Sequence, residues 1–77
     1  MSSRLPVANA RQVLAALQRA GFVVDRVRGS HYILADPDNP ARAITLPFHG
    51  ARDLKPGTLR NVIRQAGLTV DEFRELL

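Results

Sequence analysis

The alternation of apolar and polar residues predicts a first amphipathic helix that begins after Asn9 and ends before Gly21. Asn9 is a favoured N-cap residue, and Gln12 stands three positions later, as in a capping box. Gly21 suits the left-handed position that follows a helix end. Between these limits, apolar residues recur at the i, i+3, i+4 and i+7 spacing of one helical face, at Ala10, Val13, Leu14 and Leu17.

The same helical spacing returns in the C-terminal part of the chain. Pro56 falls in the first turn of this second helix, where proline is tolerated, and Gly67 follows its end. Thr69 and Glu72 form another capping box, which predicts a short last helix. The apolar faces of these two helices consist of Leu59, Val62, Ile63 and Ala66, and of Val70, Phe73, Leu76 and Leu77.

Between the helices, β-prone runs alternate with turn residues and predict three short strands. Gly29 separates the first two strands, because glycine adopts backbone angles that other residues avoid. A cluster of turn-forming residues at 36–40, with two prolines, separates the second strand from the third, and Pro47 ends the third. The predicted strands cover residues 22–28, 30–34 and 42–46.

These elements predict an α+β fold with the order α-β-β-β-α and a short extra C-terminal helix. The short connections favour a three-stranded antiparallel meander. Both main helices need apolar cover, so we expect them to pack on one face of the sheet and to leave the other face open.

In the second strand, alternation places His31 and Ile33 on one face and Ser30, Tyr32 and Leu34 on the other.

The length of 77 residues fits a single small domain over residues 1–77, with a modest core. The chain has no cysteine, which excludes a disulfide scaffold and a cysteine-ligated zinc site. No apolar run reaches the length of a transmembrane helix, and the first residues lack the apolar core of a signal peptide. We therefore expect a soluble, cytoplasmic protein with no membrane partner.

The formal net charge is +4, from 11 Lys and Arg residues against 7 Asp and Glu residues. Lys55 is the only lysine, so the other cations are arginines, which are well suited to bidentate phosphate contacts. A small basic domain invites a nucleic-acid interpretation. A solvated, arginine-rich surface has the same composition, and charge alone does not choose between the two.

His31 has the clearest candidate chemistry, because it begins a strand directly beside the turn at Gly29. Histidine is the side chain that both gives and takes a proton near neutral pH. An ordinary half-exposed strand histidine would have the same local pattern. The residue type by itself therefore leaves both interpretations open.

The chain contains, in order, Gly21-Phe22, Gly29-Ser30-His31, Leu46-Pro47-Phe48-His49-Gly50, 54–60, 63–68 and Glu72-Phe73. With these fragments it resembles the HicA-like mRNA interferase toxins, from about residue 9 to residue 77. The resemblance implies a fold like that of double-stranded-RNA-binding domains, in agreement with the predicted element order. It also implies that the protein is the toxin of a type II toxin–antitoxin system. Such a toxin is an endoribonuclease that cleaves RNA without needing the ribosome. The resemblance further implies that a HicB-like antitoxin silences the toxin. It also implies that His31 is the catalytic histidine.

This chemistry assigns roles to His31 and to several other residues. Cleaving RNA at its own 2′-hydroxyl requires a base, an acid and positive charge near the phosphorane. His31 is the candidate general base or acid, and Arg28 and Lys55 are candidate phosphate ligands or else solvated cations. Gly29 lets the turn place the histidine. Ser30 either orients the site through a hydrogen bond or is simply a small residue in a tight turn.

His49 has two interpretations. It either faces the site as a second acid/base or RNA contact, or it is a loop histidine that hydrogen-bonds the backbone. A metal site of His31 and His49 with Asp25 or Asp53 can be drawn, but the ligands are too few and their spacing too arbitrary. We therefore expect no metal and no cofactor.

Two alternatives to an RNA-cleaving toxin stay open. The first is a non-catalytic RNA-binding domain of the double-stranded-RNA class, which needs no histidine at a strand start. Against it, the loop after the third strand has one lysine, Lys55, where such domains cluster several. The second is a protein that binds an antitoxin but has lost RNA cleavage. The sequence also leaves open which RNA sequence is preferred. It does not fix the oligomeric state of the free protein, for which a monomer is one possibility.

Overall fold

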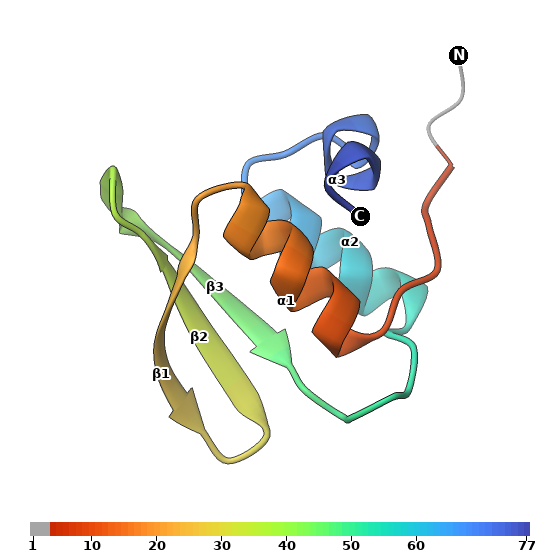
Figure 1. Cartoon of the computed structure of the whole chain (residues 1–77), viewed down its shortest axis with the longest axis horizontal. Helices are drawn as coiled ribbons and strands as arrows, with labels where there is room; N and C mark the ends of the chain where they lie inside the picture. Colours follow the sequence, from red (N-terminus) through yellow and green to blue (C-terminus); the bar gives the residue numbers. More distant parts are fainter. Residues whose placement is uncertain (1–3) are drawn as a thin grey trace.

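The structure is a computed structural model that describes residues 4–77 (Figure 1). Its element order is α-β-β-β-α followed by a short third helix, which confirms the predicted fold class. The elements are α1 (Ala10–Arg19), β1 (Val23–Arg28), β2 (His31–Asp36), β3 (Asn39–Pro47), α2 (Pro56–Gln65) and α3 (Val70–Leu76).

The three strands form one antiparallel sheet in the order β1-β2-β3, so β2 is the central strand. A two-residue turn, Gly29-Ser30, joins β1 to β2 and places Arg28 opposite His31. Gly29 has a φ of 56°, in the left-handed region that a type II′ hairpin turn requires at its first central position. The glycine thus allows the tight reversal after which β2 begins at His31.

The predicted limits of the second and third strands were wrong. β2 continues to Asp36, and β3 begins at Asn39 instead of at residue 42. The turn between them is confined to Pro37 and Asp38, where the Asp36 carboxylate accepts a hydrogen bond from the Asp38 N–H (2.9 Å). β3 also contains two prolines, one near its start and one at its end. They are tolerated because β3 is an edge strand.

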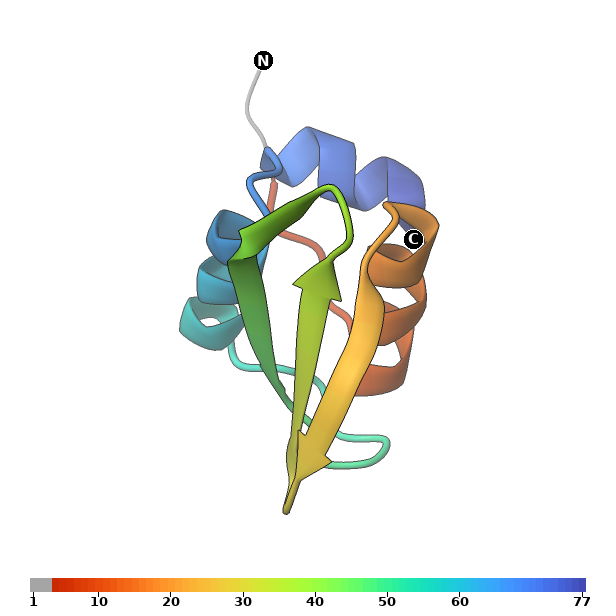
Figure 2. The same ribbon diagram turned by 90° about the vertical axis from the view of Figure 1, so that its left-hand side faces the viewer.

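Both main helices cover the same face of the sheet, and the opposite face is open, as predicted (Figure 1, Figure 2). α1 and α2 each contact β3, and α3 packs against both helices. Figure 2 shows α3 at the end of the domain opposite the β1–β2 turn. Among residues 4–77, no helix has both the length and the apolar character that a membrane span needs.

The core lies between the two main helices and the sheet. Leu34 of β2 and Ile44 and Leu46 of β3 are fully buried there, and Phe73 brings α3 into the same cluster. β1 contributes no buried residue, so the core is centred under β2 and β3. The other members of the cluster are Ala8, Val13, Ala16, Leu17, Phe22, Leu59, Val62, Ile63 and Ala66.

Two hydrogen bonds fasten the C-terminal end of α2 to the edge of β3. The Arg42 guanidinium donates to the Gln65 carbonyl oxygen (3.0 Å), and the Gln65 side-chain oxygen accepts from the Thr45 N–H (2.9 Å). Gly67 follows in a left-handed conformation, with a φ of 72°, against the Arg42 guanidinium. A side chain at position 67 would collide with that guanidinium.

Candidate active site

His31 lies at the end of the sheet, in a row of three residues that face one another across the strands. Arg28 on β1 and Pro47 on β3 pair with it on either side. Directly paired residues project from the same face of a sheet, so Arg28 and His31 share a face. His31 is exposed, whereas Leu34, on the opposite face, is buried beneath the helices. The predicted division of β2 into these two faces is confirmed.

The β3–α2 loop folds back toward this end of the sheet. The Phe48 N–H donates to the Ser30 carbonyl oxygen (2.7 Å), and the Phe48 ring stacks on Tyr32 with centroids 4.5 Å apart. Farther along, the Leu54 N–H donates to the Ala8 carbonyl oxygen (2.9 Å). The loop is therefore tied to the β1–β2 turn at its start and to the segment before α1 at its end.

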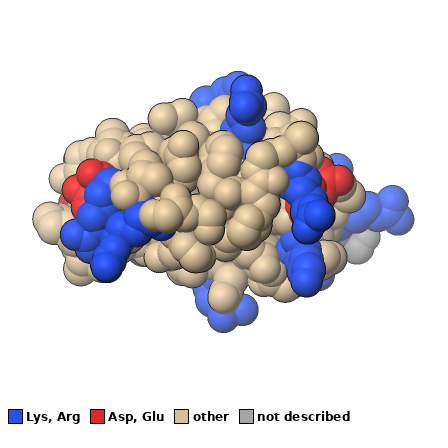
Figure 3. Space-filling view, turned by 90° about the horizontal axis from the view of Figure 1, so that it is seen from below, with Lys and Arg blue, Asp and Glu red and all other residues tan. Residues whose placement is uncertain are grey.

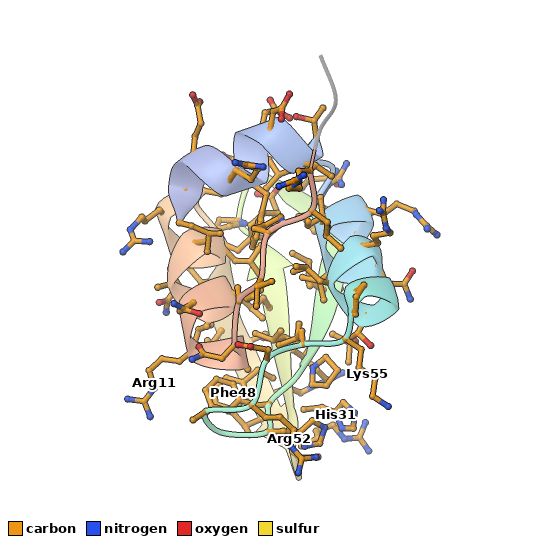
Figure 4. All side chains as sticks on the ribbon, turned by 90° about the vertical axis from the view of Figure 1, so that its right-hand side faces the viewer. Arg11, His31, Phe48, Arg52 and Lys55 are labelled. Carbon is orange, nitrogen blue, oxygen red and sulfur yellow. The ribbon has the colours of Figure 1, made fainter. Side chains whose placement is uncertain are left out.

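A cavity of about 430 Å³ opens between the loop, the start of β2 and the start of α2. This volume lies within the range of small-molecule binding sites. Figure 4 shows His31, Arg52 and Lys55 at this end of the domain, with Arg11 on the α1 side. The lining consists of the polar residues His31, His49, Arg52, Asp53, Lys55 and Thr58, and of Pro47 and Leu54.

The basic side chains of the cavity are not engaged in the fold. Within residues 4–77, the side chains of Arg52 and Lys55 make no hydrogen bond or ion pair, and the imidazoles of His31 and His49 have no hydrogen-bond partner. Among the described residues that line the cavity, Asp53 is the one carboxylate. Figure 3, which views this end of the domain, shows much more basic than acidic surface. The cavity thus presents free donors and positive charge to solvent.

α2 begins at this cavity without a side-chain cap. Lys55 occupies its N-cap position and makes no capping hydrogen bond. By contrast, Asn9 of α1 and Thr69 of α3 each complete a capping box, as the sequence predicts. The free N–H groups of a first helical turn carry partial positive charge. The start of α2 therefore adds to the positive potential that the cations create.

A model of the HicA toxins of bacterial toxin–antitoxin systems matches residues 10–68 of the 77-residue chain. The chain belongs to the HicA toxin family. The match begins at the first residue of α1 and includes every residue that lines the cavity. Membership in this family makes the protein a toxin of a toxin–antitoxin system, and this implies a cognate antitoxin as its partner. No curated protein sequence matches the chain.

In this HicA-family toxin, the cavity brings together three of the residues that the sequence singles out: His31, His49 and Lys55. Arg28 does not line the cavity, but it neighbours His31 across the hairpin. Ser30 contributes its backbone carbonyl, which holds the start of the β3–α2 loop. Its hydroxyl makes no hydrogen bond within residues 4–77. The structure therefore favours the interpretation of Ser30 as a small turn residue.

Arg52 and Thr58 also line the cavity, although the sequence analysis did not single them out. Thr58 follows Lys55 by three positions, so the helical spacing places it on the same side of α2 and could have identified it. No periodic pattern marks Arg52, because it lies in an irregular loop whose path depends on hydrogen bonds to distant segments.

Within residues 4–77, no group of three or more metal-ligating side chains is arranged to hold a metal ion. His31, His49 and Asp53 line the cavity together without forming such a group. Asp25 lies on β1, at the position where its pairing with β2 is interrupted by a shift in register. Cleavage without a metal ion stays a prediction.

Proposed function

We propose that the protein is an endoribonuclease, an mRNA interferase that cleaves RNA independently of the ribosome, and that a HicB-like antitoxin silences it. One observation carries the proposal: His31 shares an exposed cavity with cations that the fold does not use. The family match supports the toxin role. Side chains without partners in the fold are free to contact a phosphate backbone.

The cavity offers the groups that RNA cleavage requires. His31 acts as general acid or base, because an imidazole transfers protons at neutral pH. Arg52 and Lys55 contact the reacting phosphate and stabilise the charge that develops on it. Arg28, in the same row as His31, contacts an adjacent phosphate of the strand. Because His31 is exposed, RNA reaches it without displacement of any helix or strand.

A non-catalytic RNA-binding domain would use the same cations but would not need His31. Controlled expression separates the two functions: wild type should arrest growth and degrade RNA, whereas His31→Ala should be tolerated at equal abundance. Loss of a general acid or base lowers a rate by about 10²–10⁴. Circular dichroism of the purified variant tests its fold. A folded His31→Ala variant as toxic as wild type would contradict the catalytic role.

We further propose that the antitoxin blocks RNA access to His31 sterically. Arg28 and the cavity cations would attract a carboxylate-bearing partner, and such charges act mainly on the association rate. The charge reversals Arg28→Glu and Lys55→Glu should therefore slow association more than they speed dissociation. Hydrogen exchange in the complex should show protection at the β1–β2 turn and the β3–α2 loop. Protection confined to the outer helix surfaces would overturn this proposal.

A further inference from the structure

Both histidines of the chain line the cavity, although they come from different segments. His31 pairs with Pro47 in the sheet, and the Phe48 N–H donates to the Ser30 carbonyl oxygen (2.7 Å). The residue before each histidine is therefore held against the other segment by this backbone hydrogen bond. This arrangement fixes the two backbone segments beside one another, so that both imidazoles line one cavity.

The fold makes no use of the His49 side chain. Its imidazole is exposed and has no hydrogen-bond partner within residues 4–77, so it is not a loop histidine that ties down the backbone. The loop is held instead by Phe48, through its backbone bond to Ser30 and its stacking on Tyr32 at an interplanar angle of 25°. A general acid or base must reach the proton of the bound substrate, and an imidazole without a partner in the described fold is free to make that contact.

We propose that His49 is the second proton-transfer residue of RNA cleavage, working opposite His31; this inference rests on the proposed endoribonuclease function. One imidazole, in its neutral form, takes the proton from the 2′-hydroxyl as the O2′–P bond forms. The other, as imidazolium, gives a proton to the 5′-oxygen as the P–O5′ bond breaks. The products are a 2′,3′-cyclic phosphate and a 5′-hydroxyl, and each histidine ends in the protonation state that the other one had.

Other charged groups surround the two imidazoles. Arg52, Asp53 and Lys55 line the same cavity, and Arg28 faces His31 from β1. Carboxylates, lysines and arginines ordinarily titrate outside the range from pH 5 to 8, whereas histidine titrates within it. A bell-shaped dependence of kcat/KM on pH in that range would therefore report the two histidines as a pair.

The first test is the pH profile of cleavage, measured on an oligoribonucleotide that the wild-type protein cuts. Wild type should give a bell-shaped profile of kcat/KM and a cyclic phosphate product. His49→Gln keeps hydrogen-bonding capacity but cannot transfer a proton, so it should lose about 10²–10⁴ in kcat/KM and one limb of the bell. Ala51→Ser, in the same loop but outside the cavity lining, should match wild type.

The second test uses the same oligonucleotide with sulfur in place of the bridging 5′-oxygen. A thiolate leaves without a proton, so the variant that lacks the general acid should recover most of the wild-type rate, and the variant that lacks the base should not. We expect this rescue for one of the two variants His31→Ala and His49→Ala. The inference would be overturned if the sulfur substrate rescues neither variant. It would also be overturned if His49→Gln cleaves at the full rate with an unchanged bell-shaped pH profile. A wild-type protein that cleaves neither substrate would instead overturn the proposed function.

Discussion

The two ends of the sheet use their arginines differently. At the end that carries α3, Arg19 donates to the Leu76 carbonyl oxygen (2.6 Å) and Arg42 to that of Gln65 (3.0 Å). Arg74 there donates to a backbone carbonyl oxygen of the N-terminal segment (2.8 Å). At the His31 end, the cationic side chains make no hydrogen bond or ion pair within residues 4–77.

The same difference appears at the helix starts. α1 and α3 begin with capping boxes that satisfy their own N–H groups, whereas α2 begins at the cavity with Lys55 and no side-chain cap. One set of residues therefore stabilises the fold, and the other set leaves polar groups free for a ligand. The net charge of +4 combines both sets and does not distinguish them. Substitutions at the two ends should accordingly separate stability from activity.

Among the substitutions that compare the two ends of the sheet, the largest effect should come from removing the free cations of the cavity. Arg52→Ala and Lys55→Ala should each lower kcat/KM for RNA cleavage by about 10- to 100-fold, because a hydrogen bond to a charged group is worth about 1.5–3 kcal/mol. The free energy of unfolding should stay unchanged, since neither side chain has a partner among residues 4–77. Both quantities can be measured on the same preparations.

Arg60→Ala is the matched control, because Arg60 is an exposed cation of α2 that does not line the cavity. It should leave kcat/KM and stability close to the wild-type values. If Arg60→Ala lowers cleavage as much as Lys55→Ala does, general positive charge is sufficient and the cavity has no special role.

The next largest effect should appear at the opposite end, in Gly67→Ala. A residue other than glycine in the left-handed conformation is strained, and its Cβ would collide with Arg42, so the free energy of unfolding should fall by about 1–3 kcal/mol. In an Arg42→Ala background the penalty should shrink, because the collision is removed. Denaturant unfolding measures both. Cleavage per folded molecule should not change; a loss of activity without loss of stability would contradict the comparison.

The smallest effect on stability should come from a substitution that changes stability and activity in opposite directions. Lys55→Ser supplies α2 with a capping side chain and should raise the free energy of unfolding by about 0.5–1 kcal/mol. It also removes a phosphate contact, so kcat/KM should fall. The control Thr69→Ala removes the cap of α3 and should cost about 1 kcal/mol without affecting cleavage. A Lys55→Ser variant that loses stability would show that Lys55 supports the fold.

Local signals predict much of this fold. The capping boxes at Asn9 and Thr69, and Pro56 in the first turn of α2, mark the helix starts correctly, because caps depend on residues within one turn. The extent of β3 could not be predicted in the same way. Pro40 looks like a turn residue until β3 is known to be an edge strand, and strand order is a property of the whole sheet.

In the candidate site, too, residues placed by local features could be predicted, whereas those placed by distant contacts could not. His31 was found because the turn at Gly29 and the strand after it are local features. Arg52 was missed because its position depends on a loop that is tied to Ser30 and Ala8, far away in the sequence. Local signals in the sequence thus indicate the proton-transfer candidate but only some of the cations around it.

The most direct test of the account is cleavage of purified RNA by the purified protein in the presence of EDTA. Wild type should cleave, and His31→Ala, with a circular dichroism spectrum like that of wild type, should be slower by about 10²–10⁴. Cleavage by wild type that stops in EDTA and returns with a divalent ion would contradict a mechanism based on histidine alone. Equal cleavage by wild type and His31→Ala would show that the cavity around His31 is not the active site.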